Sequence, residues 1–160
     1  ARIKRNILRI FPDHRITRQD HSWQIDFLIE QGRITFFSSG AVAIPSDLKK
    51  YSFRKNGLNI ASAKLIAALK FSAIAQRNTL RDYYDLYMLA RDHYPLLELI
   101  SFTKQIFPNL SPITYTEPLV YTKDIEDEDM ASHLSPAEVI SKDQMAAFFT
   151  GELIKIREEI

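Results

Sequence analysis

The chain has 160 residues, of which 46% are hydrophobic and 26% charged, with no cysteine and a formal net charge of +1. This length suits one domain or a substantial piece of a larger one. The lack of cysteine excludes a disulfide scaffold, a thiol nucleophile and a thiolate metal site, and it is typical of a cytoplasmic protein. No apolar run reaches the roughly 18 residues of a membrane helix, so we expect a cytoplasmic protein without membrane association.

Charge is distributed unevenly along the chain. Residues 1–55 are rich in arginine and lysine, whereas residues 124–129 read DIEDED. A basic surface can bind phosphate groups, and it can equally be a solvated face, so both interpretations stay open. The chain begins with alanine in a helix-like stretch, and we expect its natural N-terminus to lie upstream.

The first third of the chain predicts one helix followed by strands. Residues 2–11 have the apolar spacing of an amphipathic helix, which a proline ends. Residues 22–29 and 33–38 are rich in β-branched and aromatic side chains and flank a glycine-containing turn, which predicts a β-hairpin. Residues 14–19 are a candidate third strand.

Two further expectations concern polar groups in this region. Asp26 lies on a predicted strand, where a carboxylate could bind a metal, but we expect it on the solvent-facing side of an edge strand. Residues 39–60 should be mostly loop, with short strands near residues 51–53. The histidines are scattered and show no spacing typical of a metal site.

The remaining chain predicts a series of helices, with Ser62 and Thr79 as the N-caps of the first two. Their expected ranges are residues 61–77, 80–92, 95–106, 112–120 and 142–158. An exposed loop containing the acidic run, His133 and Pro136 should precede the last helix. The expected fold is therefore α+β, with a small antiparallel sheet in the first third packed against a mainly helical C-terminal two-thirds. We divide it into a β-rich part, residues 1–60, and a helical part, residues 61–160.

The most informative stretch is KFSAIAQRNTLRDYYDLYML, residues 70–89. Charged side chains of both signs occur in this apolar run, namely Lys70, Arg77, Arg81, Asp82 and Asp85. A break near Asn78 predicts a corner between two helices, which would bring these charges together. Lysine and arginine placed in this way suit a triphosphate. The alternative is an Arg–Asp network that only locks two helices together.

This stretch resembles the pattern K-x2-A-x3-R-x3-RD-x2-DLY of the AbiEii/AbiGii-type nucleotidyltransferase toxin family, a polymerase-β-like group. The matching positions are Lys70, Ala73, Arg77, Arg81, Asp82, Asp85, Leu86 and Tyr87. The segments QGRITFFSSG and PLVYTKDIEDEDM are also similar to family segments, so the resemblance covers most of the chain.

The resemblance implies transfer of a nucleotide from a nucleoside triphosphate to an acceptor, often RNA, with Mg²⁺ in the full-length enzyme. It also implies a toxin–antitoxin or phage-defence system with a cognate antitoxin. Lys70 and Asp85 would be catalytic. The phosphates would be bound by Lys70, Arg77 and Arg81, and Asp82 and Tyr87 would support the site.

The sequence departs from the family pattern at the metal site. The family's Gly-Gly/Ser turn and Asp-x-Asp pair have no counterpart, and Thr35 and Leu65 occupy two positions where the family often has a carboxylate. Because these carboxylates are missing, we expect that this chain alone does not hold the two Mg²⁺ ions that in-line phosphoryl transfer needs. Two hypotheses remain open. The chain is either the C-terminal part of a nucleotidyltransferase or a catalytically degenerate binding module with a structural Arg–Asp network.

Overall fold

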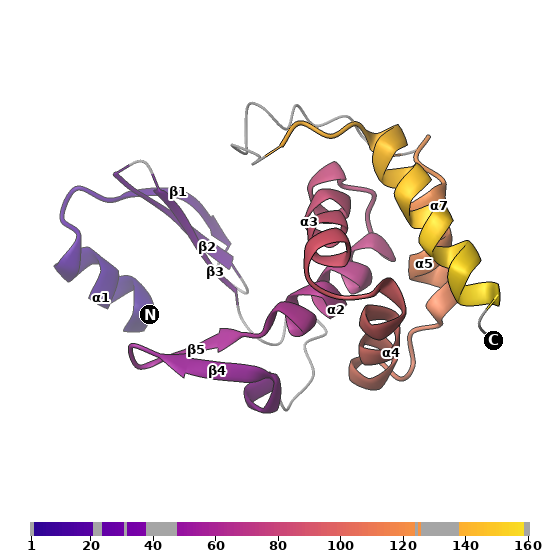
Figure 1. The fold of residues 1–160 in the computed structure, drawn as a ribbon. Coiled ribbons are helices and arrows are strands. Elements are labelled where there is room, and N and C mark those ends of the chain that lie inside the picture. Colours follow the sequence, from indigo (N-terminus) through magenta and orange to yellow (C-terminus); the bar gives the residue numbers. More distant parts are fainter. Residues whose placement is uncertain are drawn as a thin grey trace. The chain divides into compact units, whose positions relative to one another are not determined.

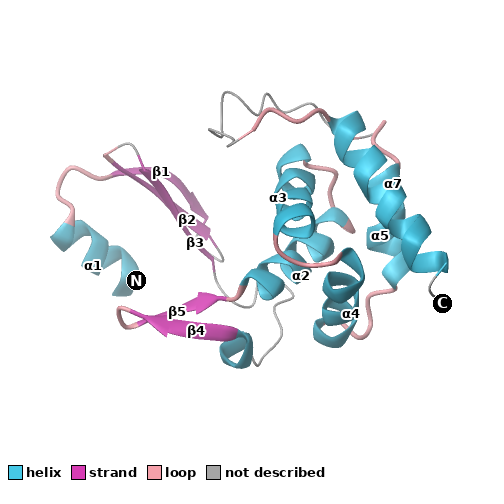
Figure 2. Cartoon of the chain, viewed as in Figure 1, coloured by secondary structure: helices cyan, strands magenta, loops and turns pink. Residues whose placement is uncertain are grey.

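The computed structural model of the chain describes residues 2–20, 24–30, 32–37, 48–123, 125 and 138–158 (Figure 1). The chain divides into two compact units, Ala1–Ser46 and Asp47–Ile160. Strands dominate the first unit and helices the second, which confirms the α+β class (Figure 2). The predicted acidic loop with His133 and Pro136 lies outside the described residues, apart from the buried Ile125.

The first unit contains a helix and a three-stranded antiparallel sheet. Helix α1 covers Arg2–Ile10, and strands β1, β2 and β3 cover Arg15–Asp20, Gln24–Ile29 and Gly32–Phe37. The sheet has the order β1-β2-β3, so the predicted hairpin and third strand are confirmed. The ring of Phe27 on the central strand is fully buried and contacts the ring of Phe36 at a centroid distance of 6.0 Å.

A second hairpin occurs where mostly loop was predicted. A short 3-10 helix, η1 (Leu48–Tyr51), leads into β4 (Ser52–Lys55) and β5 (Leu58–Ala61), which pair antiparallel. The connecting residues Asn56 and Gly57 have φ values of 50° and 80°. An Asn-Gly pair favours this left-handed turn and matches the twist of the two strands. The predicted short strand near residues 51–53 is confirmed by β4, whereas its partner β5 was predicted as loop although the turn signal was present in the sequence. This hairpin belongs to the same compact unit as the helices.

The first two helices of the second unit meet at a short connection. Helix α2 covers Ala63–Ile74, and its N-cap Ser62 accepts a hydrogen bond from the backbone N–H of Leu65 at 3.2 Å, as predicted. Helix α3 covers Leu80–Asp92. Thr79 is its N-cap, as predicted, but the Thr79 side chain makes no capping hydrogen bond. Since α2 ends at Ile74, three residues before the predicted end, the connection between the helices is longer than expected.

Three further helices complete the core of the second unit. They are α4 (Leu96–Ile106), α5 (Pro112–Val120) and α7 (Lys142–Glu158), close to the predicted ranges. Helix α2 packs against α3 and α4, and α5 packs against α7. The largest buried side chains come from all of these helices and include Phe71, Tyr83, Leu86, Leu99, Tyr115, Leu119, Met145 and Phe149. In the part of the chain that the structure describes, no helix is both long and apolar enough to span a bilayer.

One polar atom in this core lacks a partner. The ring of Tyr115 on α5 is fully buried and lies 4.9 Å from the ring of Phe71, centroid to centroid. Its hydroxyl makes no hydrogen bond within the described residues. Burial raises the pKa of this hydroxyl, because the charged phenolate would lose its hydration. Tyr115 therefore contributes packing, and its hydroxyl is a cost to folding.

Candidate functional site

The connection between α2 and α3 brings four charged side chains together. Lys70 lies on the second half of α2, Arg77 lies in the connection, and Asp82 and Asp85 lie on the first turns of α3. The apolar side chains of both helices pack into the core, which holds the two helices against each other. The helix break near Asn78 was predicted to form this corner, and the structure has it.

Asp82 is the centre of the cluster. Its carboxylate is fully buried, although charged groups are seldom buried. Oδ1 accepts a hydrogen bond from Nζ of Lys70 at 2.9 Å, and Oδ2 accepts one from Nε of Arg77 at 3.0 Å. Nη2 of Arg77 also lies 3.0 Å from Oδ2. Both oxygens therefore have charged donors, which is what a buried carboxylate requires.

Asp85 has a different environment from Asp82. Its Oδ2 atom lies 2.5 Å from Nζ of Lys70, but 40% of its side chain is exposed. Lys70 thus bridges a buried and a half-exposed carboxylate, while its own side chain is 21% exposed. The two acidic and two basic groups cancel in formal charge, so the cluster itself is close to neutral.

Two residues that the resemblance placed at the site lie outside this cluster. Arg81 is exposed, and none of the ion pairs among the described residues joins it to Asp85, its neighbour one helical turn away. The ring of Tyr87 packs against Phe148 of α7 at 5.0 Å, centroid to centroid. The guanidinium of Arg91 lies 5.3 Å from the centre of the same ring. Tyr87 therefore links α3 to α7.

Tyr83 connects the cluster to the core. Its ring is buried, and its hydroxyl donates a hydrogen bond to Oδ1 of Asn78 at 3.2 Å. Burial, and secondarily the negative charge of Asp82, raise the pKa of Tyr83 to about 12. The neutral hydroxyl holds the Asn78 side chain and thereby steadies the connection that carries Arg77. Tyr83 and Tyr84 are both buried packing residues.

Asp26 forms a separate buried polar group in the first unit, so its predicted solvent exposure was wrong. It lies on the central strand β2 directly opposite Thr35 of β3 and is fully buried. Gln24 Nε2 donates to its Oδ1 at 2.8 Å, and Arg33 Nη2 donates to its Oδ2. Burial alone would raise the pKa of Asp26, but hydrogen bonds from Gln24, Arg33 and Thr35 and the charge of Arg33 together lower it.

The described residues do not provide a metal centre. No group of three histidine, cysteine, aspartate or glutamate side chains in this part of the chain is arranged to hold a metal ion. Asp82 already has both oxygens occupied by cationic donors, and the partners of Asp26 are Gln24, Arg33 and Thr35. The residues present therefore do not fit a magnesium site.

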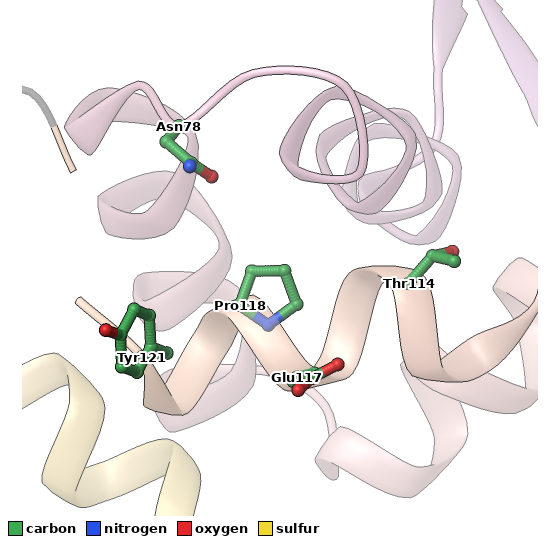
Figure 3. A pocket seen from close by; sticks show the side chains of 5 residues that line it. All are labelled: Asn78, Thr114, Glu117, Pro118 and Tyr121. Carbon is green, nitrogen blue, oxygen red and sulfur yellow. The ribbon is translucent and has the colours of Figure 1, made fainter. Parts of the chain in front are cut away.

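A cavity that the sequence did not predict lies beside the connection. It has a volume of about 210 Å³ and is lined by Asn78, Thr114, Glu117, Pro118 and Tyr121. Figure 3 shows the Asn78 side chain facing Pro118, with the other side chains spread along α5 and its end. Four of the five lining residues lie 37 to 44 positions after Arg77 in the sequence, so only the tertiary structure reveals their proximity to the connection.

The chain belongs to the nucleotidyl transferase AbiEii toxin family of type IV toxin–antitoxin systems, whose model matches residues 6–151. The family to which the resemblance pointed is thereby confirmed. The chain is also similar to an uncharacterized protein of Aquifex aeolicus (strain VF5), with 33% identity over 103 residues. That match covers 64% of this chain and 48% of the relative, so the chain spans about half the length of that protein. No solved structure matches the chain significantly.

Proposed function

We propose that this chain contributes the nucleoside triphosphate-binding corner of a nucleotidyltransferase. The observation that carries the proposal is the buried carboxylate of Asp82, which orients Lys70 and Arg77 toward one region. Lys70 has three N–H donors, and its carboxylate partners use two of them. Arg77 uses Nε and Nη2, and 57% of its side chain is exposed. Both cations thus keep donors available for phosphate oxygens.

Asp85 is suited to a second role in the same site. Its carboxylate contacts Lys70 but remains half-exposed, so a hydroxyl of an acceptor molecule can reach it. We assign Asp85 as the group that accepts the proton of this hydroxyl, and Lys70 as its counterion and the phosphate ligand. RNA is the acceptor class that the family resemblance favours. In this proposal Arg81, which is exposed one turn from Asp85, adds positive charge at the edge.

The metal and the partner are also part of the proposal. Mg²⁺ supplies charge neutralisation at the phosphates in enzymes of this kind, and here it would have to be held by groups other than the described residues. The family description, a type IV toxin–antitoxin system, supports a cognate antitoxin as the partner.

Titration with a nucleoside triphosphate tests the phosphate site directly. We expect NMR signals of Lys70 and Arg77 to shift, with weak affinity because the cluster is close to neutral, and the affinity to fall with rising salt. Lys70→Ala should reduce the affinity at least tenfold. Lys64→Ala is the matched control, since Lys64 lies on the same helix but pairs with Glu98. Unchanged Lys70 and Arg77 signals at saturating triphosphate would refute the site.

The charge balance of the cluster favours a second candidate function, a non-catalytic interaction module. Asp82 is fully satisfied within the protein, and the four charges cancel without any ligand. In this case the cluster would only lock α2 to α3. Asp82→Asn would then destabilise the protein, and the wild-type chain would show no triphosphate-dependent shift at Lys70.

A further inference from the structure

The cavity between the α2–α3 connection and α5 is lined by the ring of Pro118 and by four side chains with polar groups, namely Asn78, Thr114, Glu117 and Tyr121. Tyr121, the residue that follows α5, is 54% exposed, and Pro118 lies on α5 facing Asn78 (Figure 3). A half-exposed aromatic ring beside a cavity is a stacking surface for a planar ligand. The lining therefore suits a flat ring better than a flexible chain.

Among the polar groups that line the cavity, Asn78 offers a donor and Glu117 an acceptor. Oδ1 of Asn78 already accepts the hydrogen bond from Tyr83, which leaves the Nδ2 group of Asn78 as a donor. Glu117 is exposed on α5, and its carboxylate oxygens are hydrogen-bond acceptors. Every nucleobase presents an acceptor next to an N–H donor on its Watson–Crick edge. The Asn78–Glu117 pair is complementary to that edge.

The size of the cavity suits part of a ligand. Its volume of about 210 Å³ lies below the roughly 300–1,000 Å³ of pockets that enclose a whole drug-sized molecule. A single base fits this description, whereas a complete nucleoside triphosphate does not. The remainder of such a ligand would have to extend out of the cavity.

The ribose and phosphates of such a ligand can extend toward the neighbouring charged cluster. Asn78, which lines the cavity, directly follows Arg77, which pairs with Asp82. The Cα atoms of adjacent residues are about 3.8 Å apart, so the backbone that lines the cavity lies within one residue of the backbone that carries Arg77. The base and the phosphates of a nucleotide are joined through a ribose, which is the kind of linker that such neighbouring sites require.

We propose that this cavity is the nucleobase subsite for the nucleotide whose phosphates bind Lys70 and Arg77. Tyr121 stacks on the base, Asn78 donates to it and Glu117 accepts from it. The inference rests on the proposed function for its phosphate site, but the cavity residues and their chemistry are separate observations.

The test compares ligands with and without a base. The 160-residue chain is titrated with inorganic tripolyphosphate, with the four common nucleoside triphosphates and with the corresponding nucleosides, following backbone NMR signals. We expect nucleosides and nucleoside triphosphates to shift Thr114, Glu117 and Tyr121, and tripolyphosphate to shift only Lys70 and Arg77. At least one nucleoside triphosphate should bind about tenfold more tightly than tripolyphosphate, within the about 5–150-fold that stacking of one base supplies.

Matched variants separate the base from the phosphates. Tyr121→Leu should remove the preference for a nucleoside triphosphate over tripolyphosphate, whereas Tyr121→Phe should retain it because the ring remains. Val120→Ala, next to Tyr121 in the chain but outside the cavity lining, is the control. Tripolyphosphate affinity should be unchanged in all three variants.

Each outcome decides one of the two proposals. If neither nucleosides nor nucleoside triphosphates shift the cavity signals, or if the preference survives in Tyr121→Leu, the base subsite is refuted. If tripolyphosphate leaves the signals of Lys70 and Arg77 unshifted, the phosphate site is refuted. The base subsite is then decided by whether nucleosides shift the signals of the cavity residues.

Discussion

The burial of Asp82 makes a quantitative prediction about stability. Asp82→Asn keeps the shape of the side chain but removes the charge that Lys70 and Arg77 share. Removing one partner of a fully buried ion pair costs about 3–5 kcal/mol. Here the cost should be smaller, because 21% of the Lys70 and 57% of the Arg77 side chain are exposed and can be hydrated. We expect a loss of about 2–3 kcal/mol in the free energy of unfolding.

Asp85→Asn is the control for this prediction. Asp85 contacts the same lysine but is 40% exposed, and half-exposed ion pairs contribute about 0–1 kcal/mol. Urea denaturation measures both variants. With a slope of about 2 kcal/mol per M, Asp82→Asn should lower the midpoint by about 1 M and Asp85→Asn by less than half of that. Equal shifts for the two variants would refute the argument that burial makes Asp82 the organising residue.

Three further predictions concern stability. Tyr115→Phe removes a buried hydroxyl without a partner among the described residues, so it should leave the melting temperature unchanged or raise it; a clear decrease would contradict this. The pKa of Asp26 is lowered in the folded state, so its carboxylate contributes stability above the unfolded pKa near 3.8, and this stability is lost as the pH falls through the folded pKa. Acid melts of Asp26→Asn should therefore lack this loss, and an acid profile equal to that of the wild type would contradict the argument. Gly57 has a φ of 80°, which an alanine rarely adopts, so Gly57→Ala should lower the free energy of unfolding by about 1–2 kcal/mol. Gly151 lies within α7, where alanine is favoured, so Gly151→Ala should raise it by about 0.5–1 kcal/mol. Chemical denaturation measures both variants, and the opposite order would contradict this reasoning.

Local sequence signals were sufficient for most secondary structure. The Ser62 cap and the apolar spacing of α2, α3, α4 and α7 depend on interactions within a few residues, so they can be read directly from the chain. The Asn56-Gly57 turn was equally local and was missed although its signal is strong. The end of α2 was placed too late because no glycine or proline marks it.

The burial of charged groups could not be read in the same way. Asp82 and Asp85 are both aspartates on the first turns of α3, and no local rule says which faces α2. The packing of α2 against α3 buries Asp82 and leaves Asp85 half-exposed. Asp26 was assigned to the wrong environment for a similar reason, since its burial depends on the packing of a central strand and on Arg33 reaching across from β3.

The sequence by itself determined the family, the α+β class and the composition of the charged cluster, because a motif and its periodicity are properties of neighbouring residues. The tertiary structure alone decided that Asp82 joins Lys70 and Arg77, and that Arg81 and Tyr87 lie apart from them. It also decided that α5 forms a cavity with Asn78. The physical reason is that burial and ion pairing arise from the packing of distant segments, which brings groups together at distances that no local pattern specifies.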